Sequence, residues 1–281
     1  MRRLALWLDY EGGRFQGFQR LSPRTESVPG GGGKPRLWPA RETVQEELEC
    51  KLSLILGEPI VVLGSGRTDR GVHASGQVVA FDTQTSKDHP AILRSLNAVL
   101  CAGVRAWRAH WVPERFHPRF SAHERVYHYY LWPQGPQHSP FLGPFCWMLE
   151  EALDLPAMQR AGELLLGSHD FSAYTRKSEP GQIKIRELRS LRFHSPVLQP
   201  LLSAGPWASL GEMVCLEVRA NAFLRRMVRQ LVANLVEVGR GRWAESRPFE
   251  VLLGRDCALS ATPAPPQGLF LVHIDYGPEL V

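Results

Sequence analysis

The sequence contains little lysine, few cysteines and no long apolar segment. Five of the 33 basic residues in this 281-residue chain are lysine, which leaves 28 arginines. The five cysteines are widely separated and include no CxxC pair, which is typical of reduced, mostly buried thiols and gives a zinc site no support. No apolar run approaches the roughly 18 residues that cross a bilayer. These absences exclude a disulfide scaffold and a helical membrane protein.

The N-terminal residues predict a strand rather than a targeting segment. MRRLALWLDYEGG has a basic end and a short apolar run, as a signal peptide does. The alternation from Leu4 to Tyr10 and the Glu-Gly-Gly that follows instead favour a strand and a turn. We therefore expect a cytoplasmic location.

The composition is that of a globular protein with a modest positive charge. Hydrophobic residues make up 44% of the chain, the net charge is +5 and the isoelectric point is about 9.1. Two explanations of the arginine excess remain open. One is GC-rich codon usage, and the other is phosphate recognition by guanidinium groups.

Hydrophobic periodicity predicts an α+β fold with antiparallel sheet. Thr43 and Glu46 form a capping box at the start of one helix, and residues 221–238 form the clearest helix, which Gly239 ends. Residues 22–40 contain four consecutive glycines and are expected to be a flexible insertion. Further helices are expected over 90–100 and 154–166, with strands at 4–10, 60–63, 78–81, 120–132, 184–193, 213–220 and 268–274.

Unusual charge lies on the predicted bend between two strands, GSGRTDRGVHASGQVVAFDT at 64–83. It matches neither a P-loop nor a dinucleotide-binding turn, and the chain lacks the GxSxG, HExxH and zinc-deaminase motifs. Asp69 could simply order the turn through backbone amides. Arg67 and Arg70 would instead keep Asp69 ionised, and an ionised, positioned aspartate suits a covalent nucleophile or a group that stabilises a cation.

Two other features suggest nucleic-acid chemistry but have ordinary structural explanations. Arg229 lies near the apolar face of the predicted 221–238 helix, where it would need a carboxylate partner such as Asp69, although a solvated basic stripe is also consistent with the pattern. Tyr127 lies in an aromatic strand, where it could belong to the core or stack on a nucleobase.

The motifs resemble those of the tRNA pseudouridine synthases of the TruA type. The most specific is GRTDRGVHA at 66–74, followed by GQVVAFDT. The others occur in family order and cover nearly the whole chain: LDYEGGRFQGFQR at 8–20, ETVQEELE at 42–49, FHPRFSAHERVYHYY at 116–130, GSHDFSAY at 167–174, NAFLRRMVRQLV at 221–232 and GLFLV at 268–272.

The resemblance implies a function and a role for each matching residue. It implies conversion of uridine to pseudouridine in the anticodon stem-loop of tRNA, at positions 38, 39 and 40, without cofactor or metal. Asp69 would be the nucleophile, Tyr127 would stack on the target uracil and Arg229 would be the basic partner of Asp69. Arg67 would help displace or hold the flipped nucleotide. The insertion at 22–40 departs from the family pattern.

The resemblance also implies the architecture. It implies two α+β halves, 1–118 with the catalytic aspartate and 119–281, each similar to an RNA-recognition (ferredoxin-like) fold. The halves would share a central antiparallel sheet with flanking helices and an active cleft between them. The family generally acts as a homodimer, with one RNA touching both subunits.

Three other interpretations compete with this one. A non-catalytic RNA-binding or chaperone module is disfavoured because Asp69, Tyr127 and Arg229 are all present. A phosphate-handling hydrolase would need a P-loop lysine or a metal-binding carboxylate cluster near the bend, and neither is visible. The same chemistry on another RNA stays open, because the catalytic motifs contact the flipped uridine and not its context.

Overall fold

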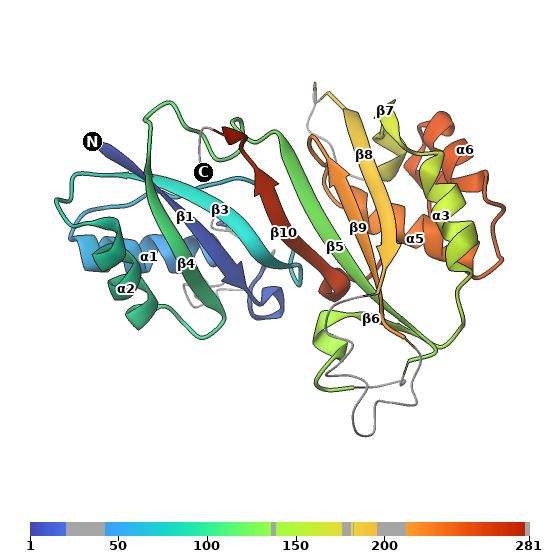
Figure 1. Cartoon of the computed structure of the whole chain (residues 1–281), viewed down its shortest axis with the longest axis horizontal. Coiled ribbons are helices and arrows are strands. Elements are labelled where there is room, and N and C mark those ends of the chain that lie inside the picture. Colours follow the sequence, from blue (N-terminus) through green and yellow to red (C-terminus); the bar gives the residue numbers. More distant parts are fainter. Residues whose placement is uncertain (21–42, 136–138, 176–180, 182, 196–211, 279–281) are drawn as a thin grey trace, which may run out of the picture. The chain divides into compact units, whose positions relative to one another are not determined.

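The computed structural model describes residues 1–20, 43–135, 139–175, 181, 183–195 and 212–278 (Figure 1). These residues form a mixed α+β fold with five α-helices and ten strands, so the predicted class is confirmed. The predicted insertion at 22–40 lies outside the described residues. No helix among the described residues is long and apolar enough to cross a membrane. The chain divides into two compact units, Met1–Ser121 and Ala122–Glu279.

The first unit contains an antiparallel sheet in the strand order β4-β1-β3, with the short β2 paired to β3. Leu4, Leu6 and Leu8 of β1 are fully buried, and two helices complete the core. The elements are β1 (Arg2–Tyr10), α1 (Val44–Leu56), β2 (Leu63–Gly64), β3 (His73–Thr83), α2 (His89–Val99) and β4 (Val104–Val112).

The start of α1 confirms the predicted capping box. The Thr43 hydroxyl accepts a hydrogen bond from the Glu46 backbone amide at 3.3 Å, and the Glu46 carboxylate accepts one from the Thr43 amide at 3.2 Å. These bonds satisfy two helix-end donors that would otherwise lack a helical partner. Leu48 and Leu52 then lie on the buried face of the helix.

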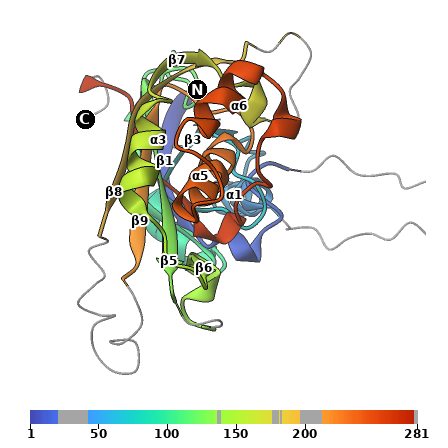
Figure 2. The same cartoon turned by 90° about the vertical axis from the view of Figure 1, so that its right-hand side faces the viewer.

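The second unit contains a sheet in the order β10-β5-β9-β8-β7, and β6 adds to β5 in parallel. Its helices α3, α5 and α6 lie together on one face of β8 and β9 (Figure 2). The elements are β5 (Glu124–Pro133), β6 (Trp147–Leu149), α3 (Leu155–Glu163), β7 (Gly167–Asp170), β8 (Ile185–His194), β9 (Val214–Ala220), α5 (Met227–Gly239), α6 (Arg247–Gly254) and β10 (Leu269–Asp275).

The prediction of a helix from Asn221 was wrong at its N-terminal end, because α5 begins at Met227. Hydrogen bonds to neighbouring strands hold Asn221 outside the helix. Its amide nitrogen donates to the Glu187 carbonyl at 3.2 Å, its side-chain oxygen accepts from the Glu187 amide at 3.1 Å, and its carbonyl accepts from Arg125 at 2.6 Å. Arg226, in the left-handed region at φ 62°, then turns the chain into the helix.

The cysteine prediction was only partly right. All five cysteines are free thiols, but Cys50 and Cys101 are exposed, and Cys146 and Cys215 are the buried ones. Four described elements, β4, β6, β7 and α6, were not predicted from the sequence.

Candidate active site

Asp69 lies in the loop that joins β2 to β3 in the first unit. The β2–β3 pairing continues into the loop through a hydrogen bond from the Ser65 amide to the Val78 carbonyl at 2.9 Å. The Asp69 carbonyl accepts a hydrogen bond from the Val72 amide at 3.1 Å, which closes a turn, and Gly71 adopts φ 81° within it. The Asp69 residue is half-buried. The sequence therefore places a carboxylate on a tight turn between two paired strands.

The segment after β1 holds this loop by backbone contacts. The Gly71 amide donates to the Gly12 carbonyl at 3.2 Å, and the Phe18 amide donates to the Thr68 carbonyl at 3.1 Å. Gly12 packs so tightly that an added Cβ would overlap the Val72 carbonyl. The backbone on both sides of Asp69 is therefore fixed by residues that lie fifty or more positions earlier in the chain.

A buried hydrogen-bond network lies beneath the loop and centres on Gln77. Its Oε1 accepts from the Ser65 hydroxyl at 2.5 Å, and its Nε2 donates to the Gly66 carbonyl at 3.0 Å and to the Tyr10 hydroxyl at 3.3 Å. Gln77 is fully buried, and Ser65 and Thr68 are nearly so. A buried amide without its hydrogen-bond partners destabilises the folded protein. Movement of the loop would break these bonds, so the network holds the loop in place.

His73 completes the support at the start of β3. Its ring is buried, and its Nδ1 accepts a hydrogen bond from the Gly12 amide at 3.2 Å. An accepting Nδ1 places the proton of the neutral ring on Nε2. Gly71 and His73 of the GVHA part of the motif thus join the loop to Gly12 by hydrogen bonds. Arg67 and Arg70, by contrast, are exposed, so both guanidinium groups can meet a polyanion.

Tyr127 lies on β5 of the second unit, opposite Val218 of β9 and Leu271 of β10. Its ring contacts Phe223 edge to face, with ring centroids 5.1 Å apart and an interplanar angle of 87°. Edge-to-face packing of this kind fixes the plane of both rings. Tyr127 is half-buried, whereas Tyr129 on the same face is fully buried. Tyr127 is therefore a positioned aromatic ring that retains exposed surface.

Arg229 lies in the first turn of α5 and is half-buried. Its Nε donates to the Ala264 carbonyl at 2.6 Å, and the Arg229 carbonyl accepts from the Ala264 amide at 3.0 Å. The Arg229 charge also acts on Tyr129, where it opposes the effect of burial, although burial dominates and raises the Tyr129 pKa well above its usual value. The orientation of the guanidinium is thus set by the chain just before β10.

Comparison with known proteins shows what the chain is related to. A family model described as tRNA pseudouridine synthase matches residues 161–277. A tRNA pseudouridine synthase A of Paraburkholderia phymatum is 36% identical over 98% of this chain and 91% of its own length. The chain belongs to the tRNA pseudouridine synthase A family. The family member of Thermotoga neapolitana is 34% identical over 98% of the chain and 99% of its own length, and that of Herminiimonas arsenicoxydans is 35% identical over 99% and 91%.

Membership confirms the resemblance that the motifs carry. It leaves the roles of individual residues as predictions. The structure places Asp69 and Arg67 on one loop of the first unit, and Tyr127 and Arg229 on β5 and α5 of the second. The predicted pairing of Asp69 with Arg229 stays a prediction.

Sequence reasoning did not identify Gln77 and Phe223 as supporting residues. Gln77 was part of a recognised motif, and its signal was a polar residue on an otherwise apolar strand. Phe223 was assigned to a helix, although the chain there is not helical. Phe223 instead packs against Tyr127.

Proposed function

We propose that this chain isomerises uridine to pseudouridine in tRNA, with Asp69 as the nucleophile. The observation that carries the proposal is the loop itself. In a member of the tRNA pseudouridine synthase A family, a half-buried aspartate lies on a turn whose backbone is hydrogen-bonded to the Gln77 side chain and to the Gly12 carbonyl. Such rigid support suits a group that must meet one atom of a substrate.

The reaction breaks one bond to C1′ of the ribose and forms another. The C1′–N1 bond breaks, the base turns, a C1′–C5 bond forms, the proton on C5 leaves to solvent and N1 gains a proton. Attack of Asp69 on C1′, its addition to C6 of the uracil, and its stabilisation of base loss all require an ionised carboxylate beside an extruded uridine. No step consumes a cofactor.

The remaining site residues act on the extruded nucleotide and on Asp69. Stacking on Tyr127 offsets part of the cost of extrusion, at about 1–3 kcal/mol per base. Arg229 orients Asp69 and keeps it charged, and the exposed Arg67 holds the flipped nucleotide through its phosphate. Phe223 supports this arrangement because it fixes the plane of the Tyr127 ring.

The proposal extends to the substrate and the assembly. The substrate is the anticodon stem-loop of tRNA, with uridines 38, 39 and 40 as targets, because extrusion costs least in a loop or at the end of a stem. The two α+β halves, 1–118 and 119–281, share a central sheet and form the active cleft between them. The protein acts in the cytoplasm as a homodimer, so that one RNA contacts both subunits.

The test measures tritium release from tRNA transcripts labelled at C5 of uridine. Wild-type protein should release tritium, and Asp69→Ala should release none while it still binds the transcript. Mapping of pseudouridine in the product should place it at positions 38 to 40. Release from ribosomal RNA but not from tRNA would overturn the substrate assignment, and binding of tRNA without release from any cellular RNA would overturn the enzyme assignment.

A further inference from the structure

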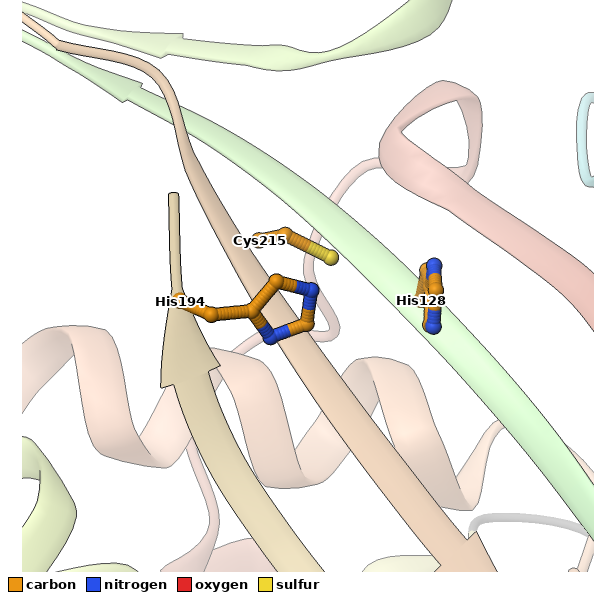
Figure 3. Close-up of side chains that lie close together, drawn as sticks. All are labelled: His128, His194 and Cys215. Atoms are coloured by element: carbon orange, nitrogen blue, oxygen red, sulfur yellow. The ribbon is translucent and has the colours of Figure 1, made fainter. Parts of the chain in front are cut away.

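Three potential metal ligands lie together on the second unit, outside the predicted catalytic residues. They are His128 of β5, Cys215 of β9 and His194 at the end of β8 (Figure 3). Their ligand atoms all lie within 4.8 Å of one another. His194 and Cys215 are direct partners in the β8–β9 register. The cluster therefore joins three adjacent strands of one sheet.

The cluster lies on the face of the sheet that α3 and α5 do not cover. On the face that the helices cover, Leu191 of β8 packs against Gly162 of α3, and Leu216 and Val218 of β9 are fully buried. Side chains alternate along a strand, so Cys215 and His194 point the opposite way. In Figure 3 the three side chains lie in front of the strands, with a helix behind them. The site is thus separated from Tyr127 and Arg229 by the thickness of the sheet.

The three residues differ in exposure in a way that suits ion binding. Cys215 is buried, the His128 side chain is 22% exposed and His194 is exposed. A metal binds a neutral imidazole through Nδ1 or Nε2, and each histidine of the cluster offers one such nitrogen. Of the three side chains, that of His194 is the most accessible to solvent.

We propose that His128, His194 and Cys215 bind a borderline-soft divalent transition-metal ion, for which Zn²⁺ is the best match. Two imidazoles and one thiolate are a donor set that zinc accepts, with a water as the fourth ligand. Zinc bonds of about 2.0–2.3 Å place neighbouring ligand atoms about 3.5 Å apart in a tetrahedron. The observed separations of up to 4.8 Å need only a small closure, which the exposed His194 ring can supply by rotation.

Neighbouring side chains provide the second layer of contacts that such a site needs. The Glu217 carboxylate lies 3.4 Å from Nε2 of His128, so it can fix the ring and add negative charge beside the ion. Tyr130 is the direct partner of Cys215 across the β5–β9 pair, so its side chain lies beside the sulfur. Burial raises the Cys215 pKa to about 12, so zinc would have to displace the thiol proton, which leaves to solvent as the Zn–S bond forms. No electron transfer is involved.

A bound ion would cross-link β5, β9 and β8 near one end of the sheet. Because the unfolded chain holds the three ligands far apart, binding would stabilise the folded unit and raise its melting temperature. The ligands lie on three strands at 128, 194 and 215, which explains why the cysteine spacing gave no zinc signal. The proposal is independent of the pseudouridine chemistry.

The test uses the full-length protein, stripped with a chelator and dialysed against zinc or cobalt. We expect one zinc per chain, a higher melting temperature, and a Co²⁺ derivative with a thiolate-to-cobalt charge-transfer band and the intense visible bands of a tetrahedral ion. His194→Asn should lose stoichiometric binding and the temperature shift, and because His194 is exposed this variant should fold. Cys215→Ser should lose the charge-transfer band.

Two control variants match the test variants. Cys257→Ser removes a half-buried cysteine of the same unit, and His273→Asn removes an exposed strand histidine, and both should bind zinc as the wild type does. Absence of zinc binding by the wild type would overturn the proposal. So would binding that survives both His194→Asn and Cys215→Ser, or a cobalt derivative without a thiolate band.

Discussion

The Tyr10 hydroxyl lies 2.8 Å from Oγ1 of Thr68, so the last residue of β1 is hydrogen-bonded to the residue that precedes Asp69. The same hydroxyl accepts a hydrogen bond from Gln77 of β3. β1 and β3 therefore both bond the loop region through one buried oxygen. The position of Asp69 depends on the packing of the first unit as well as on the loop sequence.

Removal of the Gln77 amide should reduce turnover more than substrate binding. Gln77→Met keeps a long unbranched side chain but leaves the Ser65 hydroxyl and the Gly66 carbonyl without their partner. We expect a loss of about 1–3 kcal/mol in the free energy of unfolding, together with a lower kcat and a nearly unchanged KM. Denaturant unfolding and steady-state tritium release measure the two effects.

The control for Gln77 is an exposed glutamine just beyond the same strand. Gln84→Met should leave both stability and kcat unchanged, because Gln84 is exposed and only its backbone amide is seen to bond Glu58. A Gln77→Met enzyme with wild-type kcat would show that the network does not position Asp69.

Two adjacent glycines provide a matched pair of variants. Gly12→Ala places a Cβ against the Val72 carbonyl, whereas nothing lies within 4 Å of a Cβ at Gly13. Overpacking of this kind typically costs about 1–3 kcal/mol and moves the backbone, so Gly12→Ala should lower both the melting temperature and kcat. Gly13→Ala should match the wild type in both. Equal behaviour of the two variants would contradict the proposed backbone contact with the loop.

Loss of the Tyr127 ring should weaken binding of the anticodon stem-loop. Tyr127→Ala removes a base-stacking surface, for which we expect a cost of about 1–3 kcal/mol in RNA affinity, while Tyr127→Phe should keep the affinity. Phe223→Leu removes the edge-to-face partner of Tyr127, and it should weaken RNA binding by about 0.5–1.5 kcal/mol in free energy. Filter binding with Asp69→Asn as background measures affinity without turnover. Wild-type affinity in Tyr127→Ala would exclude stacking.

The contribution of Arg229 to kcat should depend on the hydrogen-bonding geometry of its guanidinium group and not on its charge alone. Arg229→Lys keeps the charge but cannot reproduce the bond from Nε to the Ala264 carbonyl. A hydrogen bond of a charged group contributes about 1.5–3 kcal/mol, so we expect at least a tenfold fall in kcat. Arg225→Lys, at an exposed position, is the control and should keep wild-type kcat. Equal rates for the two variants would remove Arg229 from the site.

Local signals in the sequence predicted the elements that have local causes. The capping box at Thr43 and Glu46 is one, and the strand that contains Tyr127 is another, since both depend on neighbours in the chain. The start of α5 could not be predicted in this way. Asn221 is held out of the helix by Glu187 and Arg125, which are distant in sequence, and long-range hydrogen bonds outweigh the helical pattern there.

The same distinction between local sequence signals and long-range contacts applies to the candidate site. Asp69 and Arg67 were found because one short motif contains both. Tyr127 and Arg229 were singled out from an aromatic strand and a helical pattern, and the family resemblance supplied their roles. The contacts that support them, from Gln77 to Gly66 and from Arg229 to Ala264, join different elements and become visible only in the structure. The cluster of His128, His194 and Cys215 has the same origin in strand pairing.

The most direct test of the account is the activity of Asp69→Asn. The substitution keeps the size of the side chain on a loop that the Gln77 network holds, so the variant should fold, bind the tRNA anticodon stem-loop with near wild-type affinity and release no tritium from C5-labelled uridine. Measurable release by a pure sample that has the correct mass, after asparagine deamidation is excluded, would contradict the assignment of Asp69 as the nucleophile.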